Sequence, residues 1–228
     1  MKSRADNDRI VDGAAFLDRF NVSRETFEKL DTYVRLLRLW QKTINLVAPG
    51  TLDDVWHRHF ADSAQLHALV PTTARTLADL GSGAGFPGLV LAILASGARE
   101  TTPGHALSVT LIEADQRKCA FLREVARAVD IPVDILSTRI ETSASVLLER
   151  GVDVVTARAL APLDRLCSLA APLMSASGVC LFLKGRAAAG ELAAARASWA
   201  FDAELIESMT DPEGRIVVLR RVSPHTGG

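Results

Sequence analysis

The spacing of hydrophobic residues along this chain changes near residue 76. Before that point, apolar residues recur every three to four positions between Phe27 and Trp40, a spacing typical of an amphipathic helix, and Ser23 is a suitable N-cap. After a polar break, Thr51 is in the position of a second N-cap, and the helix that it starts should end before Pro71. The pattern in residues 1–75 therefore predicts a helical extension that packs on the rest of the chain.

From Thr76 onward, short apolar runs alternate with longer helical segments. The strand candidates are Thr76–Leu80, Leu107–Ile112, Val133–Leu136, Val152–Thr156 and Val179–Leu183. Helices are expected between and after them, near Phe86–Ser96, Gln116–Val129, Ser143–Arg150, Leu163–Met174 and Ala187–Ser198. Strands that alternate with helices favour an α/β fold with a parallel sheet covered on both faces.

The alternation of strands and helices stops near the end of the chain. Two further strand candidates, Phe201–Ser208 and Arg215–Arg221, are joined by a short turn-rich link, which favours an antiparallel hairpin. The predicted sheet thus has seven strands, mostly parallel, within a core that spans residues 76–222. Residues 223–228 are predicted to form a disordered tail.

Composition fits one globular core and narrows the possible settings. The chain has 228 residues, 48% of them hydrophobic and 23% charged, and no apolar run long enough to cross a membrane. The polar segment Met1–Asp8 lacks the apolar stretch of a signal peptide, and the three cysteines show neither pairing nor metal spacing. We therefore expect a cytoplasmic protein with reduced thiols, no bound metal and no membrane partner. The net charge of −1 means that any nucleic-acid surface must gather its cations on one face.

Residues Leu77–Gly88 hold the most informative motif. A short apolar run ends in glycines at alternate positions, Gly81, Gly83 and Gly85, and an apolar helix follows Pro87. Glycine allows a ligand to approach bare backbone, and a helix N-terminus offers N–H groups to an anion or a polar ligand. The alternative is a glycine-rich turn without a ligand.

The spacing of the motif separates two classes of nucleotide site. Phe86 stands where a dinucleotide-binding fingerprint has its third glycine, which argues against a dehydrogenase. With Asp79 two residues before the first glycine, the pattern resembles motif I of the Rossmann-like class I S-adenosylmethionine (SAM) methyltransferases. The product of such an enzyme is S-adenosyl-L-homocysteine.

Residues at the ends of the strands are the next candidates, because ligands on such sheets bind outside the carboxyl ends of the strands. Glu113 could accept hydrogen bonds from both ribose hydroxyls, or be a solvated acid. Glu113 lies farther along the sequence from the glycines than is usual. A polar insertion at Gly97–His105, which we predict to be a surface loop, explains the extra length. Ile140 and Glu141 follow the third strand, where adenine is expected, although Glu141 could equally be a first-turn acid of the next helix.

No residue stands out as a catalytic base or nucleophile. The fourth strand ends at Arg158 without the Asn/Asp-Pro-Pro-aromatic motif of enzymes that methylate amino groups, and Cys167 and Cys180 lie in apolar stretches. A target with an exposed lone pair, such as N7 of guanine, needs no deprotonation before it attacks the methyl group. Alignment alone could then supply several kcal/mol, up to ~7–11 in favourable cases.

Several segments, in order along most of the chain, resemble the RsmG (GidB) family of bacterial 16S ribosomal RNA guanine-N7 methyltransferases. They are Asn45–Val47, Arg58–Ser63, Asp79–Gly88, Leu111–Lys118, Phe121–Arg123, Thr156–Ala159 and Leu183–Gly185. The segment Arg58–Ser63, with Asn45 before it, is more diagnostic than the glycine motif. The insertion at Gly97–His105 departs from the family pattern, as does Leu160, where the family often has Phe.

This resemblance implies roles for particular residues. Those implied to bind SAM are Gly81, Phe86, Ile140, Glu141 and Arg158, and Gly83 and Glu113 join them from the glycine loop and the end of the second strand. Those implied to face the RNA are Asn45, His59, Arg139 and Lys184, although His59 could instead be a helix histidine bonded to Asp62. A cationic helix face with Arg117, Lys118, Arg123 and Arg127 could lie on the RNA path or be merely solvated.

The sequence therefore predicts a monomeric, SAM-dependent methyltransferase that modifies N7 of one guanine in 16S ribosomal RNA. The site would lie in the decoding-region loop of the small subunit. Two alternatives remain open at this point: an enzyme of the same fold that methylates a small molecule, and a Rossmann-like RNA-binding protein that does not catalyse.

Overall fold

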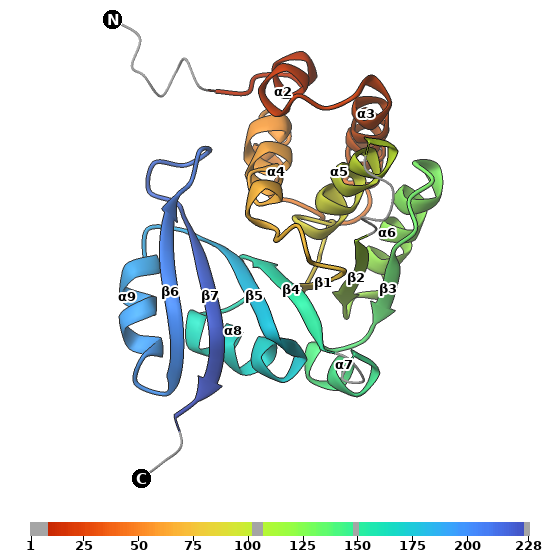
Figure 1. Cartoon of the computed structure of the whole chain (residues 1–228). Helices are drawn as coiled ribbons and strands as arrows, with labels where there is room; N and C mark the ends of the chain where they lie inside the picture. Colours follow the sequence, from red (N-terminus) through yellow and green to blue (C-terminus); the bar gives the residue numbers. More distant parts are fainter. Residues whose placement is uncertain (1–8, 102–106, 148–150, 226–228) are drawn as a thin grey trace, which may run out of the picture.

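A computed structural model describes residues 9–101, 107–147 and 151–225 and contains one seven-stranded sheet (Figure 1). The strands are β1 (Thr76–Leu80), β2 (Ser108–Glu113), β3 (Asp134–Ser137), β4 (Val152–Arg158), β5 (Met174–Lys184), β6 (Trp199–Glu207) and β7 (Arg215–Pro224). Their order is β3-β2-β1-β4-β5-β7-β6, with β7 antiparallel to both β5 and β6 and the other neighbours parallel. The predicted α/β fold with a C-terminal antiparallel hairpin is confirmed.

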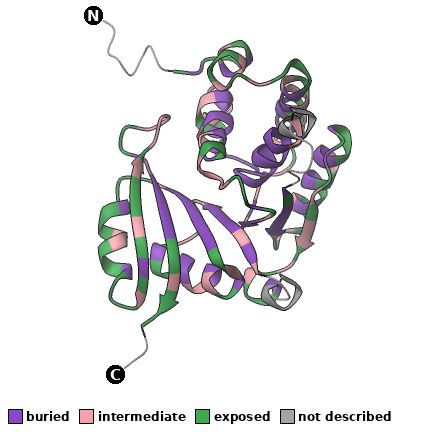
Figure 2. Cartoon of the chain, viewed as in Figure 1, coloured by how far each residue is buried: buried purple, intermediate pink, exposed green. Residues whose placement is uncertain are grey.

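Alternate residues of the central strands enter two separate hydrophobic clusters, one on each face of the sheet. On one face, Leu77 of β1 packs with residues of α3 (Arg24–Trp40), α5 (Gly88–Thr101) and α6 (Gln116–Ala128). On the other face, Ala78 packs with residues of α8 (Leu163–Ala170) and α9 (Ala188–Ala195), and α7 (Ile140–Leu147) contributes Ile140. Buried positions accordingly line both sides of the sheet (Figure 2).

The N-terminal helices differ from the prediction in two ways. A helix that the sequence analysis missed, α2 (Gly13–Phe20), precedes α3 and is capped by the side chain of Asp12. The single helix expected after Thr51 is divided into short segments of different pitch, which include the coiled ribbon labelled α4 in Figure 1. These are η1 (Pro49–Thr51, 3-10), η2 (Trp56–Ala61, π), α4 (Asp62–Ala64) and η3 (His67–Leu69, 3-10). Single-turn π segments are rare and often lie at functional sites.

Other boundaries also shift. Helix α5 runs to Thr101, so residues 97–101 of the expected surface loop are helical, and residues 102–106 lie outside the described part of the chain. Strand β7 continues through Ser223 and Pro224, because these residues pair with the start of β6. The prediction of a disordered tail is therefore wrong for these two residues, and residues 226–228 are not described.

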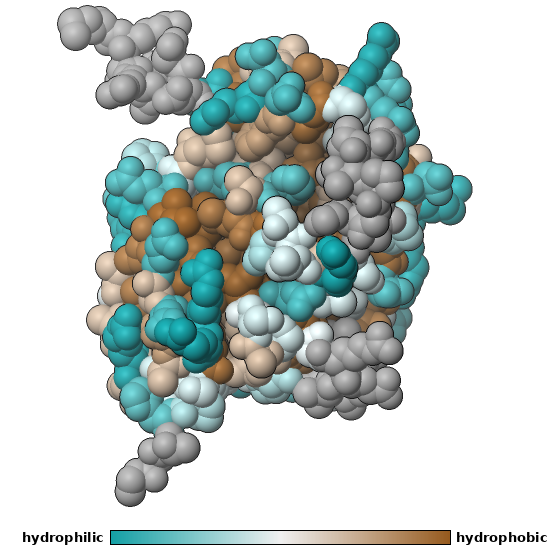
Figure 3. Space-filling view, in the orientation of Figure 1, coloured by the Kyte–Doolittle hydropathy of each residue, from teal (hydrophilic) through white to brown (hydrophobic). Residues whose placement is uncertain are grey.

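The surface shown in Figure 3 is mixed, with hydrophobic residues over β5, β6 and β7 and hydrophilic residues around them. Leu205 of β6 is among the few large apolar side chains that are exposed. Among the residues that the structure describes, none of the helices combines the length and apolarity that a membrane crossing requires.

Candidate functional site at the carboxyl ends of the strands

The glycine loop between β1 and α5 has a left-handed backbone at Gly81, Gly83 and Gly85, with φ of +64°, +57° and +92°. Side chains are disfavoured at such φ values, so the loop requires glycine. Tyr33 of α3, which is fully buried, donates a hydrogen bond from its hydroxyl to the carbonyl of Ala84. The N-terminal helices therefore hold the loop in place.

A carboxylate at the end of β2 fixes the same loop from the other side. Glu113 accepts a hydrogen bond from the backbone N–H of Gly83 through Oε2 and one from Asp115 through Oε1, each at 2.8 Å. Each carboxylate oxygen has a second lone pair, so Glu113 can still accept from a ligand hydroxyl. The sequence placed Glu113 near the loop but did not show this direct bond.

Asp79, also in the motif, is fully buried at the end of β1 and organises the start of α5. Its carboxylate accepts hydrogen bonds from the hydroxyl of Thr156 at 2.7 Å and from the N–H of Gly88 at 3.2 Å. Burial raises the pKa of Asp79 to about 6, and the hydrogen bond from Thr156 opposes this rise. The expectation that the N-terminus of α5 presents open N–H groups is therefore wrong for Gly88, because Asp79 occupies its N–H.

A cavity of about 450 Å³ adjoins the glycine loop and brings several predicted residues together. Gly81, Gly83, Phe86, His59 and Arg158 all line it. Lys118, from the cationic helix face that could lie on the RNA path, lines it as well. Sequence reasoning did not propose site roles for the remaining lining residues, which are Leu46, Val47, Ala48, Thr51, Arg58, Asp62, Ser82, Ala84, Ala159, Thr210 and Asp211.

Arg158, at the end of β4, connects the sheet to the π-helix. Its Nη1 donates to the carbonyl of Arg58 at 3.1 Å and to Nδ1 of His59 at 2.9 Å, and lies 3.5 Å from Oδ2 of Asp62. The guanidinium also stacks over the ring of Phe86, 5.0 Å from its centroid. Among the described residues, all hydrogen bonds of the Arg158 side chain go through Nη1, which leaves Nε and Nη2 for a ligand.

His59 is buried, and its hydrogen bonds define its tautomer. Arginine can only donate, so Nδ1 accepts from Arg158 and the proton is on Nε2, which lies 2.7 Å from the hydroxyl of Thr51. Thr51 in turn donates to the carbonyl of Ala48 at 2.6 Å. Burial and the nearby charges of Arg158 and Arg58 lower the pKa of His59 to about 3. His59 is therefore neutral, and it bonds to Arg158, not to Asp62.

A second cavity, of about 430 Å³, continues from the first and shares Asp62, Arg158, Ala159 and Asp211 with it. Lys184, predicted to face RNA, lines this cavity, but its side chain is only 10% exposed. Its ammonium pairs with Glu191 at 2.6 Å and donates to the carbonyl of Ala161 at 2.9 Å. The other cations that line this second cavity are Arg158, Arg186 and Arg215.

Five predicted residues line neither cavity: Glu113, whose bond to Gly83 is described above, and Asn45, Arg139, Ile140 and Glu141. Asn45 is exposed beside the loop that Gln41 anchors, and Arg139 is exposed just before α7. Ile140 packs against the hydrophobic cluster on the α8 side, and Glu141 pairs with Arg165. The start of α7, where the sequence analysis expected adenine, lies at the outer end of the sheet, next to the end of β2, where the N–H of Thr138 donates to the carbonyl of Glu113.

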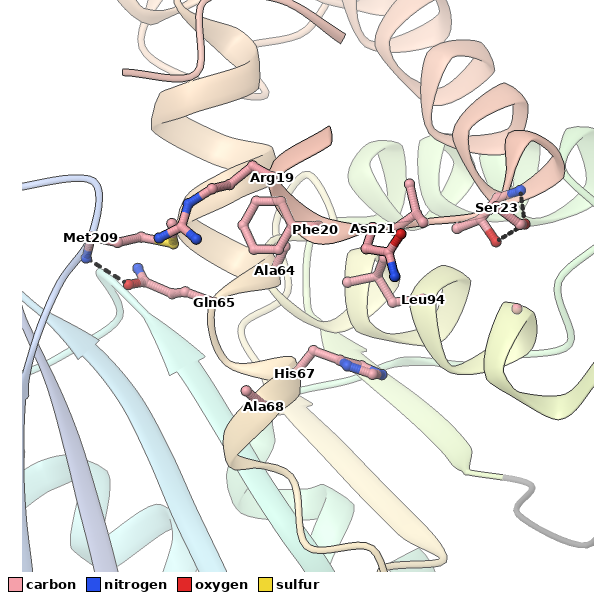
Figure 4. A pocket seen from close by; sticks show the side chains of 13 residues that line it. Arg19, Phe20, Asn21, Ser23, Ala64, Gln65, His67, Ala68, Leu94 and Met209 are labelled. Carbon is pink, nitrogen blue, oxygen red and sulfur yellow. Dashed lines mark hydrogen bonds between the residues drawn. The ribbon is translucent and has the colours of Figure 1, made fainter. Parts of the chain in front are cut away.

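The loop between β6 and β7 forms a wall of the site that sequence reasoning read only as a turn. Thr210 donates from its hydroxyl to Oδ1 of Asp62 at 2.7 Å, and its carbonyl lies 3.0 Å from Nε2 of His57. The N–H of Met209 donates to Gln65 at 2.9 Å (Figure 4). These bonds span about 150 positions of sequence, so no local pattern indicates them.

A third cavity, of about 700 Å³, lies behind this wall and contains none of the predicted site residues. Gln65 and Met209 border it on one side, and Leu94 of α5 borders it on the other (Figure 4). Within the described residues, no group of three or more His, Cys, Asp or Glu side chains could hold a metal ion.

The sequence is similar to known proteins along most of its length. A family model described as rRNA small subunit methyltransferase G (GidB) matches residues 26–217. The chain is 53% identical over 212 residues to the "Ribosomal RNA small subunit methyltransferase G" of Parvibaculum lavamentivorans, covering 93% of this chain and 90% of that protein. It is 52% identical over 207 residues to the protein of the same name from Paramagnetospirillum magneticum, covering 91% and 94%.

Solved structures support the fold. A methyltransferase from Geobacter sulfurreducens superposes with a TM-score of 0.56 at 14% identity, covering 91% of this chain and 94% of that one. The two chains thus share a fold at low sequence identity. The family match covers far more than half of the chain, and this chain therefore belongs to the GidB family of small-subunit rRNA methyltransferases.

Proposed function

We propose that this protein transfers the methyl group of SAM to N7 of one guanine in the decoding-region loop of 16S ribosomal RNA. The observation that carries the choice of a lone-pair target is the state of the side chains around the first cavity. Both ring nitrogens of His59 are engaged, and Asp62 accepts from Thr210 and Gln65. His59 and Asp62 are thus both held by protein partners, and N7 of guanine has no proton to lose, so transfer to it needs neither of them as a base.

The residues around the glycine loop fit SAM. A Cβ at Gly83 would meet only the carbonyl of Gly81, at 3.8 Å, so the loop leaves open space there, and Glu113 retains acceptor capacity for ribose hydroxyls. Bound SAM supplies an electrophilic methyl group on a sulfonium. The contribution of the chain is to hold the incoming base in line with that methyl group and to exclude water.

Most of the predicted site residues keep a proposed role that is consistent with their position. Gly81, Gly83 and Glu113 would hold the ribose and methionine portions of SAM, and Ile140 with Glu141 would border the adenine. Phe86 supports the site by packing between His59 and Tyr33. We place Asn45 and Arg139 on the path of the RNA.

Two of the residues expected to contact RNA are better described as supports. His59 holds Arg158, and Lys184 holds the loop after β4 through Ala161 and Glu191. The cations left to meet phosphates near the two cavities are Arg58, Lys118, Arg186 and Arg215. Their contacts would offset the few kcal/mol that splaying a base from its RNA loop costs.

We further propose that the chain acts as a monomer in the cytoplasm. The three cysteines are buried and unpaired, as expected in a reducing compartment. The edge strand β6 carries Asp202, Glu204 and Glu207, and such charges discourage pairing with a second copy.

The test supplies labelled SAM with small ribosomal subunits that lack the modification. Incorporation into 16S RNA, mapped by chemical cleavage at 7-methylguanosine to one position in the decoding region, is the expected result. Labelling of small molecules in the absence of RNA, or SAM binding without any transfer to RNA, would contradict the proposal.

A further inference from the structure

The loop between β6 and β7 places a carboxylate, Asp211, in the wall shared by the first two cavities. Its Oδ1 accepts the N–H of Glu213 at 2.9 Å, an interaction within the loop itself. Within the described ranges its Oδ2 has no protein partner. The other carboxylates that line these cavities are engaged: Asp62 with Thr210 and Gln65, and Glu191 with Lys184 and the N–H of Leu163.

The sheet sets the distance between this carboxylate and the glycine loop. The start of β7 pairs with the end of β5, at Arg215 and Lys184, so the loop before β7 lies at the carboxyl edge of the sheet. Along that edge the order is β1, β4, β5, β7. Three strand spacings of about 4.8 Å amount to about 14 Å, enough for a flat base to stand between the two loops.

The hydrogen-bonding groups of guanine are placed around the ring in a way that suits this arrangement. If N7 faces the methyl donor at the glycine loop, the N1–H and N2–H₂ donors at the far side of the ring face the opposite wall. A carboxylate can accept from both donors at once. Adenine has an acceptor at N1 and no amino group at C2, so the same carboxylate would repel it.

We propose that Asp211 is a specificity-determining residue that accepts the N1–H and N2–H₂ groups of the target guanine. The inference rests on the proposed function, since it assumes that a guanine enters the cavity. The bonds from Asp62, His57 and Gln65 hold the loop, and they thereby hold Asp211 at a fixed distance from the methyl donor.

The test combines a protein change with a base change. Asp211→Asn keeps an acceptor for Glu213 but loses the charge and one acceptor. Inosine at the target position of the RNA lacks the N2 amino group but keeps N7. The matched control is Glu213→Gln, which removes the same charge from the same loop but does not line either cavity.

The wild-type protein should lose about tenfold to a hundredfold in kcat/KM on inosine RNA. Asp211→Asn should lose a similar factor on guanosine RNA, with little further loss on inosine RNA and unchanged affinity for S-adenosyl-L-homocysteine. Glu213→Gln should behave like the wild type.

Two results would overturn the inference while the proposed function stands: an Asp211→Asn protein as active as wild type on guanosine RNA, or the same inosine penalty in both proteins. A wild-type protein that transfers no methyl to the guanosine RNA would instead overturn the proposed function, and this inference with it.

Discussion

Arg158 donates a hydrogen bond from Nη1 to Nδ1 of His59 at 2.9 Å, and this bond joins the end of β4 to the π-helix across 99 positions of sequence. The other nitrogen of the imidazole, Nε2, is bonded to the hydroxyl of Thr51. Thr51 in turn donates to the carbonyl of Ala48, in the loop that borders the cavity. The side chain of His59 thus connects the sheet, the π-helix and the rim of the site through hydrogen bonds. His59 acts by positioning its neighbours, because neither of its ring nitrogens is free.

His59→Phe should keep the stacking on Phe86 but lose both hydrogen bonds. We expect methyl transfer to fall at least about tenfold, since hydrogen bonds to charged groups contribute about 1.5–3 kcal/mol. Thr51→Val, which cuts only the Nε2 end of the relay, should have a smaller effect. Steady-state rates on small subunits measure both, and equal losses in the two variants would show that the bond to Arg158 is not the important one.

The pH dependence of stability should reveal two opposing groups. Asp79 has a pKa of about 6 in the folded protein and 3.8 ordinarily, so its contribution is greatest below pH 3.8 and is lost as pH rises through 6. His59 has a pKa of about 3 against 6.5, so its contribution is greatest above pH 6.5 and is lost as pH falls toward 3. Between pH 4 and 6 the two slopes oppose each other.

Single variants should separate these slopes. In His59→Phe the free energy of unfolding should fall more steeply from pH 4 to pH 6 than in wild type, and in Asp79→Asn it should rise more steeply, by up to about 1.4 kcal/mol per pH unit. Urea titrations at several pH values provide the measurement. Identical slopes in all three proteins would mean that neither pKa is shifted.

Two glycine-to-alanine changes, one in the glycine loop and one in α9, should have opposite effects on stability. Gly83→Ala places a side chain on a backbone with φ of +57°, which should cost about 1–2 kcal/mol of stability and weaken SAM binding. Gly190→Ala, in the first turn of α9 with open space around it, should stabilise the protein by up to about 1 kcal/mol and leave SAM binding unchanged. Thermal unfolding and calorimetry check the pair. A stabilised Gly83→Ala protein with normal affinity would contradict the role of this loop.

The sequence predicted the parts of the fold that local patterns encode. The alternation after Thr76 predicted the parallel strands and the hairpin, and the spacing of Gly81, Gly83 and Gly85 predicted the loop. It did not reveal the π-helix, because apolar spacing between Thr51 and Pro71 suits an α-helix equally well. Helix α2 was missed because eight residues make a weak periodic signal.

The site was harder to predict because its contacts are distant in sequence. The bond from Thr210 to Asp62 spans 148 positions, and neither residue has a local feature that indicates the other. Asp211 was hidden in the same way, as one residue of an apparent turn. Lys184 is a different case: the family resemblance implies that it faces RNA, whereas its partner in the structure, Glu191, lies only seven residues away.

Lys184→Ala should therefore mainly lower the free energy of unfolding, and it should not specifically weaken RNA binding. It leaves Glu191 without its ammonium partner in a largely buried position and removes the bond to Ala161, at an expected cost of about 2–3 kcal/mol. Arg24→Ala, which breaks an exposed pair with Glu28, should change stability by less than about 0.5 kcal/mol. Urea unfolding compares the two, and binding to small subunits is measured at a temperature where both remain folded. If Lys184→Ala were as stable as wild type and lost only RNA affinity, the ammonium would have to leave Glu191 to meet the RNA, and the supporting role argued for it would be wrong.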